Sequence, residues 1–294
     1  MKKLSFPLLL CVLGGVFLCG CCTCQEKYTH PIKCVSHRGE EFDAPEASFP
    51  AFRLAMQNKA DIVKLDIRFT RDGEVVLSHD STLERMMNWN VKVKDVTLKE
   101  IKERDFITVG GYAGEKLLTL REALPVIKDS PEFWLDFKAF TPQGFEKVIA
   151  EFDRLKISHD RLMVATFTIS ALEYARKKYP EIRRVNHISI TQNLDGSYTG
   201  SIFPAHSRTP EAIVKHLLAR RDKYALYGFN MSVHAIRRGF LTAEMITELR
   251  RNGVWCSLYY VHDKKAAKVC GVVSADAFVT GRIGEVRPYC RRND

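Results

Sequence analysis

The chain has 294 residues, of which 46% are hydrophobic and 27% are charged, and its formal net charge is +10. This composition is typical of a globular protein and excludes a long disordered or low-complexity chain. The positive charge is typical of proteins that act on anionic surfaces or on substrates that carry phosphate. The basic residues are scattered and no nucleic-acid-binding motif is present, so no nucleic-acid partner is expected.

Residues 1–20 are predicted to be a lipoprotein signal peptide and not a part of the folded domain. Two lysines follow the initial methionine, an apolar run extends from residue 4 to residue 18, and residues 18–21 read Leu-Cys-Gly-Cys. This tetrapeptide resembles the bacterial lipobox, which makes Cys21 the predicted lipidation site and residues 21–32 a tether. The alternatives are an ordinary signal peptide and an uncleaved anchor, but the run is short for a spanning helix of ~20 residues. We therefore expect an exported lipoprotein, held at a membrane surface of the bacterial cell envelope by its lipid anchor.

Residues 33–294 are predicted to form one domain, a (β/α)₈ barrel, whose usual length is ~250 residues. Strands alternate with helices along the chain, which favours a parallel sheet. The predicted strands are 34–37, 62–69, 75–77, 133–138, 162–167, 184–189, 227–232, 254–261 and 277–280. The predicted helices are one capped by Ser48, then 97–103, 120–128, 144–155, 170–178, 211–220 and 243–251. The strands outnumber the eight positions of such a barrel, so one is either misread or lies outside the ring. The longest predicted loop is 191–209.

Charged side chains alternate with apolar ones on the predicted strands. Val63, Leu65 and Ile67 alternate with Lys64 and Asp66, so the two sets lie on opposite faces of the strand. Barrel enzymes carry their chemistry at the carboxyl ends of the strands. The side chains expected there are His37 and Arg38 from the first strand, Lys64 and Asp66 from the second, His79 from the third, and Asp136 and Lys138 from the fourth. A single member of this set would usually be structural, but their convergence predicts a functional centre.

Short motifs in a fixed order cover nearly the whole mature chain. They are His37-Arg38-Gly39, Ala44-Pro45-Glu46, Ala51-Phe52, Asp66 followed by Thr70-Arg71-Asp72-Gly73, Val75-Val76, His79-Asp80, Arg85 with Asn88, Asp136-Phe137-Lys138, Thr166-Phe167 and, more weakly, Tyr259-Tyr260 and Phe278-Val279-Thr280. In this order the motifs resemble the glycerophosphodiester phosphodiesterase family. The resemblance implies a TIM barrel of the phospholipase C-like phosphodiesterase type, which hydrolyses glycerophosphodiesters to an alcohol and glycerol phosphate. It also implies a divalent cation, Mg²⁺ or Ca²⁺, and a pair of histidines.

The predicted residue roles follow the chemistry of a phosphodiester. Histidine carries protons near neutral pH, so His37 and His79 are the predicted acid and base, with their order left open. Arg38 offers a bidentate fork to the phosphate, and Lys64 and Lys138 supply further positive charge. Trp134 or Tyr259 is expected to pack against the glycerol or the leaving group.

The chain departs from the family pattern at the implied metal site. Lys64 stands where the family usually has Glu, Asp136 is shorter than the usual Glu, Ala47-Ser48 replaces Asn-Thr, and Thr280-Gly281 replaces Thr-Asp. Hard cations need several oxygen ligands, and an ammonium group repels them. We therefore expect the Lys64 ammonium to replace the metal between Asp66 and Asp136, as an arginine does in the similar bacterial phosphatidylinositol-specific phospholipases C. The alternative is that Asp66, Asp136 and Glu46 still bind Mg²⁺ or Ca²⁺ while Lys64 turns aside.

Three functions remain open on this basis. A phosphodiesterase that acts on glycerophosphodiesters or related lipid headgroups is favoured, because both histidines and Arg38 are present. The second is a cyclising lyase that acts on a phospholipid or its headgroup. The third is a catalytically silent lipoprotein that binds such headgroups.

Overall fold

The computed structural model describes residues 32–107, 111–192, 198–200, 209–273 and 275–290. The predicted signal peptide, Cys21 and nearly all of the predicted tether lie outside the described residues, as does most of the loop predicted at 191–209. In the described part of the chain, none of the helices has the length and apolar character needed to cross a membrane.

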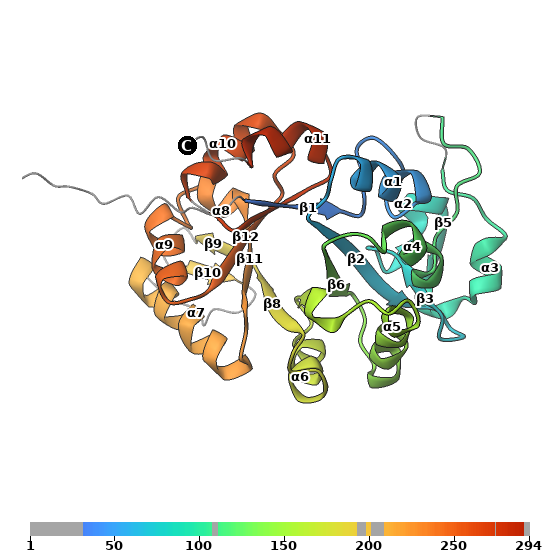
Figure 1. The fold of residues 1–294 in the computed structure, drawn as a ribbon, viewed down its shortest axis with the longest axis horizontal. Coiled ribbons are helices and arrows are strands. Elements are labelled where there is room, and N and C mark those ends of the chain that lie inside the picture. Colours follow the sequence, from blue (N-terminus) through green and yellow to red (C-terminus); the bar gives the residue numbers. More distant parts are fainter. Residues whose placement is uncertain (1–31, 108–110, 193–197, 201–208, 274, 291–294) are drawn as a thin grey trace, which may run out of the picture.

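A closed ring of eight parallel strands forms the centre of the domain (Figure 1). In ring order the strands are β1 (Lys33–His37), β2 (Ile62–Phe69), β6 (Glu132–Phe137), β7 (Leu162–Thr166), β8 (Arg183–Ile188), β11 (Gly228–Ser232), β12 (Trp255–Tyr259) and β13 (Ala277–Thr280). The ring closes because β1 pairs with both β13 and β2. The predicted (β/α)₈ barrel is confirmed.

Nine strands were predicted, and the one that lies outside the ring is the third in chain order, at residues 75–77. β3 (Val75–Leu77) pairs antiparallel with β2 across the turn at Gly73, and it extends the sheet instead of closing it. Because a tight turn reverses the chain, a strand that follows one cannot be parallel to its neighbour. The chain then leaves the barrel through β4 (Thr82–Leu83) and β5 (Trp89–Lys92), a small hairpin that was not predicted. The expectation that His79 comes from the third barrel strand is therefore wrong.

Most of the helices surround the ring on its outer side, and α2 (Glu84–Met87) and α3 (Leu98–Lys102) pack with the small hairpin outside it (Figure 1). In chain order, the helices are α1 (Phe49–Gln57), α2 (Glu84–Met87), α3 (Leu98–Lys102), α4 (Leu120–Ile127), α5 (Pro142–Arg154), α6 (Ile169–Lys178), α7 (Pro210–Tyr224), α8 (Val233–Arg237), α9 (Ala243–Arg251), α10 (Lys264–Val272) and α11 (Ile283–Val286). Short 3₁₀ turns lie at Val93–Asp95, His159–Arg161 and Arg287–Tyr289, and β9 (Ile190–Gln192) pairs with β10 (Tyr198–Gly200).

Local sequence explains where several helices begin. Ser48 caps α1 as predicted, because its hydroxyl accepts the backbone N–H of Ala51. Thr97 and Thr119 each form a capping box with the glutamate three residues later, which starts α3 and α4. The helices that were not predicted, α2, α8, α10 and α11, are short or lack a strong apolar period.

The two faces of the barrel strands bury different kinds of side chains. Val63, Leu65 and Ile67 face the helices in the large outer core, as the alternation predicts. The interior of the ring holds a smaller apolar cluster, to which Trp134, Met163 and Val185 belong. The interior positions closer to the carboxyl ends of the strands are polar, and Lys64 and Asp66 are buried there. The apolar cluster therefore forms a floor beneath a polar centre.

Candidate active site

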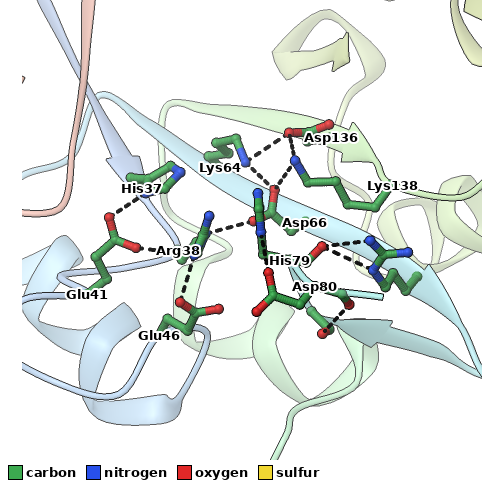
Figure 2. A network of polar contacts seen from close by, with 12 residues as sticks. His37, Arg38, Glu41, Glu46, Lys64, Asp66, His79, Asp80, Asp136 and Lys138 are labelled. Carbon is green, nitrogen blue, oxygen red and sulfur yellow. Dashed lines mark hydrogen bonds and ion pairs between the residues drawn. The ribbon is translucent and has the colours of Figure 1, made fainter. Parts of the chain in front are cut away.

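Strand register brings the predicted side chains together at the carboxyl end of the barrel. His37 of β1 pairs with Lys64 of β2, and Asp66 of β2 pairs with Asp136 of β6. Residues paired in this way point to the same face of a sheet, so these four side chains lie inside the ring. Figure 2 shows them directed toward one centre, with Arg38 and Lys138 beside them.

The turn after β1 requires glycine. Arg38 and Gly39 have φ angles of +56° and +83°, and the next residue, Glu40, donates its N–H to the carbonyl of Ala51 in α1 at 3.1 Å. A Cβ atom on Gly39 would lie 2.6 Å from the Ala51 backbone. Only glycine accepts both this φ and this close approach at little cost. The turn thereby holds His37 and Arg38 against the first helix.

His37 is buried and pairs with an acidic residue that the sequence prediction did not include. Its Nδ1 lies 2.5 Å from Oε1 of Glu41, and its ring meets the edge of Tyr260 at 4.7 Å between centroids. Burial, reinforced by the positive charge of Lys64, holds the pKa of His37 well below its usual value. Burial also raises the pKa of Glu41 to about 7. Glu41 follows His37 by only four residues, and the turn at Arg38-Gly39 folds the chain back. This turn is the sequence signal from which the contact between Glu41 and His37 could have been predicted.

His79 follows β3 and reaches the same centre from outside the ring (Figure 2). The Arg68 guanidinium donates two hydrogen bonds to its carbonyl oxygen, at 3.1 and 2.8 Å. Its Nδ1 lies 2.8 Å from Oδ1 of Asp80, whose other oxygen accepts from Arg85 at 2.6 Å. Burial lowers the pKa of His79 as well. Both imidazoles therefore have a carboxylate at Nδ1, which leaves Nε2 for a ligand.

Lys64 lies between two aspartates at the centre. Its Nζ contacts Asp66 and lies 3.0 Å from Oδ2 of Asp136, which is also 2.8 Å from Nζ of Lys138. Arg38 donates from Nε to the other oxygen of Asp66 at 3.0 Å. Burial alone would lower the pKa of Lys64, but Asp136 and Asp66 outweigh it and raise the pKa to about 12. Burial likewise opposes ionisation of Asp66, yet Lys64 and Lys138 bring its pKa well below the usual value.

The carboxylates do not fit a site for Mg²⁺ or Ca²⁺. Glu46 accepts from Arg38 at 2.7 Å and from Arg85 at 2.8 Å, so its charge is already compensated. Both oxygens of Asp66 contact cationic groups, and so does one oxygen of Asp136. Within the described ranges, no cluster of three or more acidic, histidine or cysteine side chains has a geometry that would hold a metal ion. The Lys64 ammonium lies where a cation would need these oxygens.

A cavity of about 60 Å³ opens onto both histidines. Lys64, Asp136, Lys138 and Tyr259 of the predicted set line it. The other lining residues are outside that set, and they are Phe167, His187, Asn230, Tyr260 and Val279. His187 and Asn230 lie inside the ring, in positions that the alternation with outward-facing Ile188, Phe229 and Met231 would have indicated. Both strands were predicted, but neither polar residue was predicted to belong to the site.

The two predicted aromatic contacts differ in their placement. Tyr259 lines the cavity and donates its hydroxyl to the carbonyl of Ile188 at 3.1 Å. Trp134 is fully buried in the apolar floor, and its Nε1 donates to the carbonyl of Ala165 at 2.9 Å. It is absent from the cavity lining, so its position does not suit the predicted packing against the glycerol or the leaving group.

Comparisons with known proteins identify the family of this chain. A family model, the glycerophosphoryl diester phosphodiesterase family, matches residues 37–285. A glycerophosphodiester phosphodiesterase of Caldanaerobacter subterraneus subsp. tengcongensis is 32% identical over 227 residues, which are 75% of this chain and 82% of the relative.

Solved structures share the fold. An Oleispira antarctica phosphodiesterase in complex with the product sn-glycerol-3-phosphate superposes with a TM-score of 0.70 and 21% identity, covering 88% of this chain and 96% of that one. A Thermotoga maritima glycerophosphodiester phosphodiesterase gives a TM-score of 0.64 at 22% identity, covering 89% and 99%. With the family model matching most of the domain and the two histidines at one cavity, the chain belongs to the glycerophosphoryl diester phosphodiesterase family.

Proposed function

We propose that this protein hydrolyses glycerophosphodiesters by acid–base catalysis between His37 and His79, without a divalent cation. The observation that carries the proposal is the single cavity shared by both imidazoles and by Lys64 and Lys138. A phosphodiester placed there would meet positive charge and two proton carriers at once. The related Oleispira enzyme, which holds sn-glycerol-3-phosphate as its product, supports this class of substrate.

The two imidazoles can supply both proton transfers that hydrolysis requires. One imidazole takes a proton from the attacking water through Nε2, and the other gives a proton to the oxygen of the departing alcohol. The P–O bond to the alcohol breaks as the bond to the water oxygen forms, which leaves glycerol phosphate and a neutral alcohol. Burial keeps both imidazoles neutral in the free protein. The anionic substrate favours protonation of one of them, because an adjacent negative charge raises the pKa of a histidine.

The acidic partners fix the imidazoles for these roles. Glu41 at Nδ1 of His37 and Asp80 at Nδ1 of His79 orient each ring and stabilise its charged form. Glu41 reaches His37 through space that Gly281 leaves open, because a Cβ at position 281 would lie 2.6 Å from Cγ of Glu41. The family usually carries Asp at position 281, so this chain supplies the acidic group from a different strand end.

Positive charge at the phosphate comes from side chains. Lys64, Lys138 and Arg38 surround Asp66 and Asp136, so these five groups carry a net charge of +1 (three cations and two anions). Exchanging the family's glutamate for Lys64 removes a negative charge and adds a positive one where the metal would bind. The ammonium then performs the charge neutralisation for which relatives use a cation.

Turnover of glycerophosphocholine, followed by phosphorus NMR with and without EDTA, tests the proposal. We expect glycerol phosphate as the product, at an undiminished rate in EDTA, and no turnover by the double variant His37→Ala, His79→Ala. Loss of activity in EDTA would overturn the metal-free mechanism. A cyclic phosphate as the final product would identify a cyclising lyase instead, and saturable binding without turnover would identify a headgroup-binding protein.

We also propose that the enzyme is anchored to a membrane of the bacterial cell envelope through acylated Cys21. The basic start, the apolar run and the lipobox-like tetrapeptide at residues 18–21 support this localisation. An anchor of this kind would keep the barrel near phospholipid-derived substrates. Cys21→Ser should move the protein from the membrane fraction to the soluble fraction and remove incorporation of labelled palmitate. The proposed anchor would be refuted if the wild type carried no acyl label and Cys21→Ser still associated with the membrane.

A further inference from the structure

We propose that Asp136 and His187 form a hydroxyl-binding subsite, which accepts hydrogen bonds from the glycerol moiety of the substrate. This inference rests on the proposed function and deepens it, because it names the group that the cavity recognises beside the phosphate. It concerns two atoms that the acid–base mechanism does not use.

Two residues that line the cavity each carry a buried atom that lacks a hydrogen-bond partner among the described residues. These atoms are Oδ1 of Asp136 and Nε2 of His187, on side chains that line the same cavity. The two residues are only 1% and 4% exposed. Nearly all buried polar atoms in folded proteins are paired, so an unpaired couple beside a cavity indicates a partner that arrives with the ligand.

Both atoms are hydrogen-bond acceptors. The imidazole of His187 is hydrogen-bonded to the backbone of Ala165, and a carbonyl can only accept, so Nδ1 carries the proton and Nε2 presents its lone pair. Burial lowers the pKa of His187 to about 4, which keeps the ring neutral. The other oxygen of Asp136 already contacts Lys64 at 3.0 Å and Lys138 at 2.8 Å. A ligand must therefore supply donors here.

The surrounding charges select a neutral donor. A phosphate oxygen would be repelled by a carboxylate and a lone pair, whereas Lys64 and Lys138 nearby disfavour a third cation such as an ethanolamine ammonium. A choline group has no N–H to donate. A glycerol hydroxyl is neutral, donates one hydrogen bond and is attached close to the phosphate, so it satisfies all three conditions.

Titration calorimetry with two phosphate monoesters tests this subsite without turnover. Glycerol 3-phosphate and propyl phosphate have the same carbon chain, but only the first has hydroxyl groups. We expect the wild type to prefer glycerol 3-phosphate by about tenfold to a hundredfold, because a hydrogen bond to a buried or charged acceptor has this effect on an equilibrium. His187→Leu should reduce the preference by about tenfold, and His187→Gln, which retains an acceptor oxygen, should keep more of it than His187→Leu.

The matched control is His159→Leu. His159 precedes β7 at the opposite end of the barrel and contacts Asp153 and Glu181, so this variant should keep the wild-type preference. Circular dichroism verifies that each variant is folded. A preference in His187→Leu within about twofold of wild type would overturn the subsite while leaving the hydrolase proposal intact. Absence of binding of either ester to the wild type would overturn both proposals.

A second, independent observation concerns two thiols at the ends of the barrel chain. We propose that Cys34 and Cys290 form a disulfide in the exported protein. Both are buried, and their Sγ atoms lie 2.8 Å apart. The neighbouring backbone is also joined, since Ile32 donates its N–H to the carbonyl of Cys290 at 3.1 Å.

The oxidation balances with an external disulfide as oxidant. Each thiol loses one hydrogen, the S–S bond forms, and two electrons reduce the disulfide of oxidised glutathione or of a thiol–disulfide oxidoreductase to two thiols. The hydrogen bond between Cys34 and Cys290 and burial both raise the pKa of the Cys34 thiol, which makes it unreactive once folded. The bond is therefore expected to form during folding, before the two segments are buried.

Peptide mapping of full-length protein refolded in oxidised glutathione tests the pair. We expect one linked peptide containing Cys34 and Cys290 that disappears after reduction, and an unlinked, alkylated Cys256, which is the buried control thiol. Reduction should lower the thermal midpoint by about 10 °C in the wild type and in Cys256→Ser, but not in Cys34→Ser. Recovery of Cys34 and Cys290 as separately alkylated peptides would overturn the proposal.

Discussion

Replacement of Lys64 by methionine should reveal how much the barrel depends on the central ammonium. The substitution keeps the approximate length of the side chain but removes its charge, and it leaves Asp66 and Asp136 buried. Lys138 and Arg38 still contact these carboxylates, at 2.8 Å and 3.0 Å. The aspartates therefore lose one of their partners but not all of them.

The contact geometry sets the magnitude. Two unit charges 3.0 Å apart, as for Lys64 and Asp136, attract by about 5 kcal/mol at an effective dielectric constant of ~20. Breaking a buried ion pair from one side typically costs about 3–5 kcal/mol, and the remaining cations favour the lower value. We therefore expect Lys64→Met to lower the free energy of unfolding by about 3 kcal/mol at neutral pH.

The same reasoning gives a pH dependence. The pKa of Lys64 is raised by folding to about 12, so its stabilisation is complete below the unfolded value of about 10.4 and is lost as the pH rises through 12. The pKa of Asp66 is depressed by folding, so the contribution of Asp66 is present above about pH 3.9 and is lost as the pH falls through its folded value. The difference between wild type and Lys64→Met should therefore shrink toward both extremes.

Urea unfolding monitored by circular dichroism measures this difference. Lys94→Met is the matched control, because Lys94 is exposed and, within the described part of the chain, forms an ion pair only with Asp95, at 2.7 Å. The unfolding midpoint of this variant should equal that of wild type. A loss below about 1 kcal/mol in Lys64→Met would refute the idea that its ammonium compensates buried carboxylates. Lys64→Glu provides the functional counterpart, since its activity should become dependent on added Mg²⁺ or Ca²⁺.

Three further predictions address the histidines and their support. Glu41→Ala should reduce kcat about tenfold or more, because His37 loses a charge-assisted hydrogen bond. Adding Gly281→Asp to this variant should restore part of the kcat. An unchanged kcat in Glu41→Ala would exclude a role for Glu41 in positioning His37. Gly39→Ala should destabilise the fold by about 3 kcal/mol in chemical unfolding, owing to its φ of +83° and the clash with Ala51, and a smaller loss than about 1 kcal/mol would contradict this. The acidic limb of kcat/KM should lie below pH 6.5, because burial lowers the pKa of both His37 and His79, and a limb at or above that pH would contradict the placement of buried, neutral imidazoles.

Most of the barrel was predictable because its strands carry a local pattern. Alternation on β2 separates Val63, Leu65 and Ile67 from Lys64 and Asp66, and the structure places the two sets on the helix side and in the ring interior. Caps such as Ser48 and Thr97 mark helix starts by chemistry that acts over three residues. The motifs also predicted that His37, Arg38 and His79 lie at one centre.

Contacts between residues far apart in the sequence could not be predicted from such local patterns. The alternation does not reveal whether β3 closes the ring or pairs outside it, and only the turn at Gly73 and the register with β2 decide this. Trp134 and Asp136 lie on the same face of one strand. Trp134 is two residues farther from the carboxyl end, and this places it in the apolar floor instead of the cavity lining.

The sequence by itself determined the fold, the family and most of the residues that converge at the cavity, because periodicity and motif order depend on near neighbours along the chain. The tertiary structure decided which groups compensate one another. Lys64 between Asp66 and Asp136, Glu41 in the space beside Gly281, and the unpaired acceptors of Asp136 and His187 all depend on distances between separate strands. Electrostatic and hydrogen-bond partners are chosen by proximity in space, and a linear pattern does not contain that information.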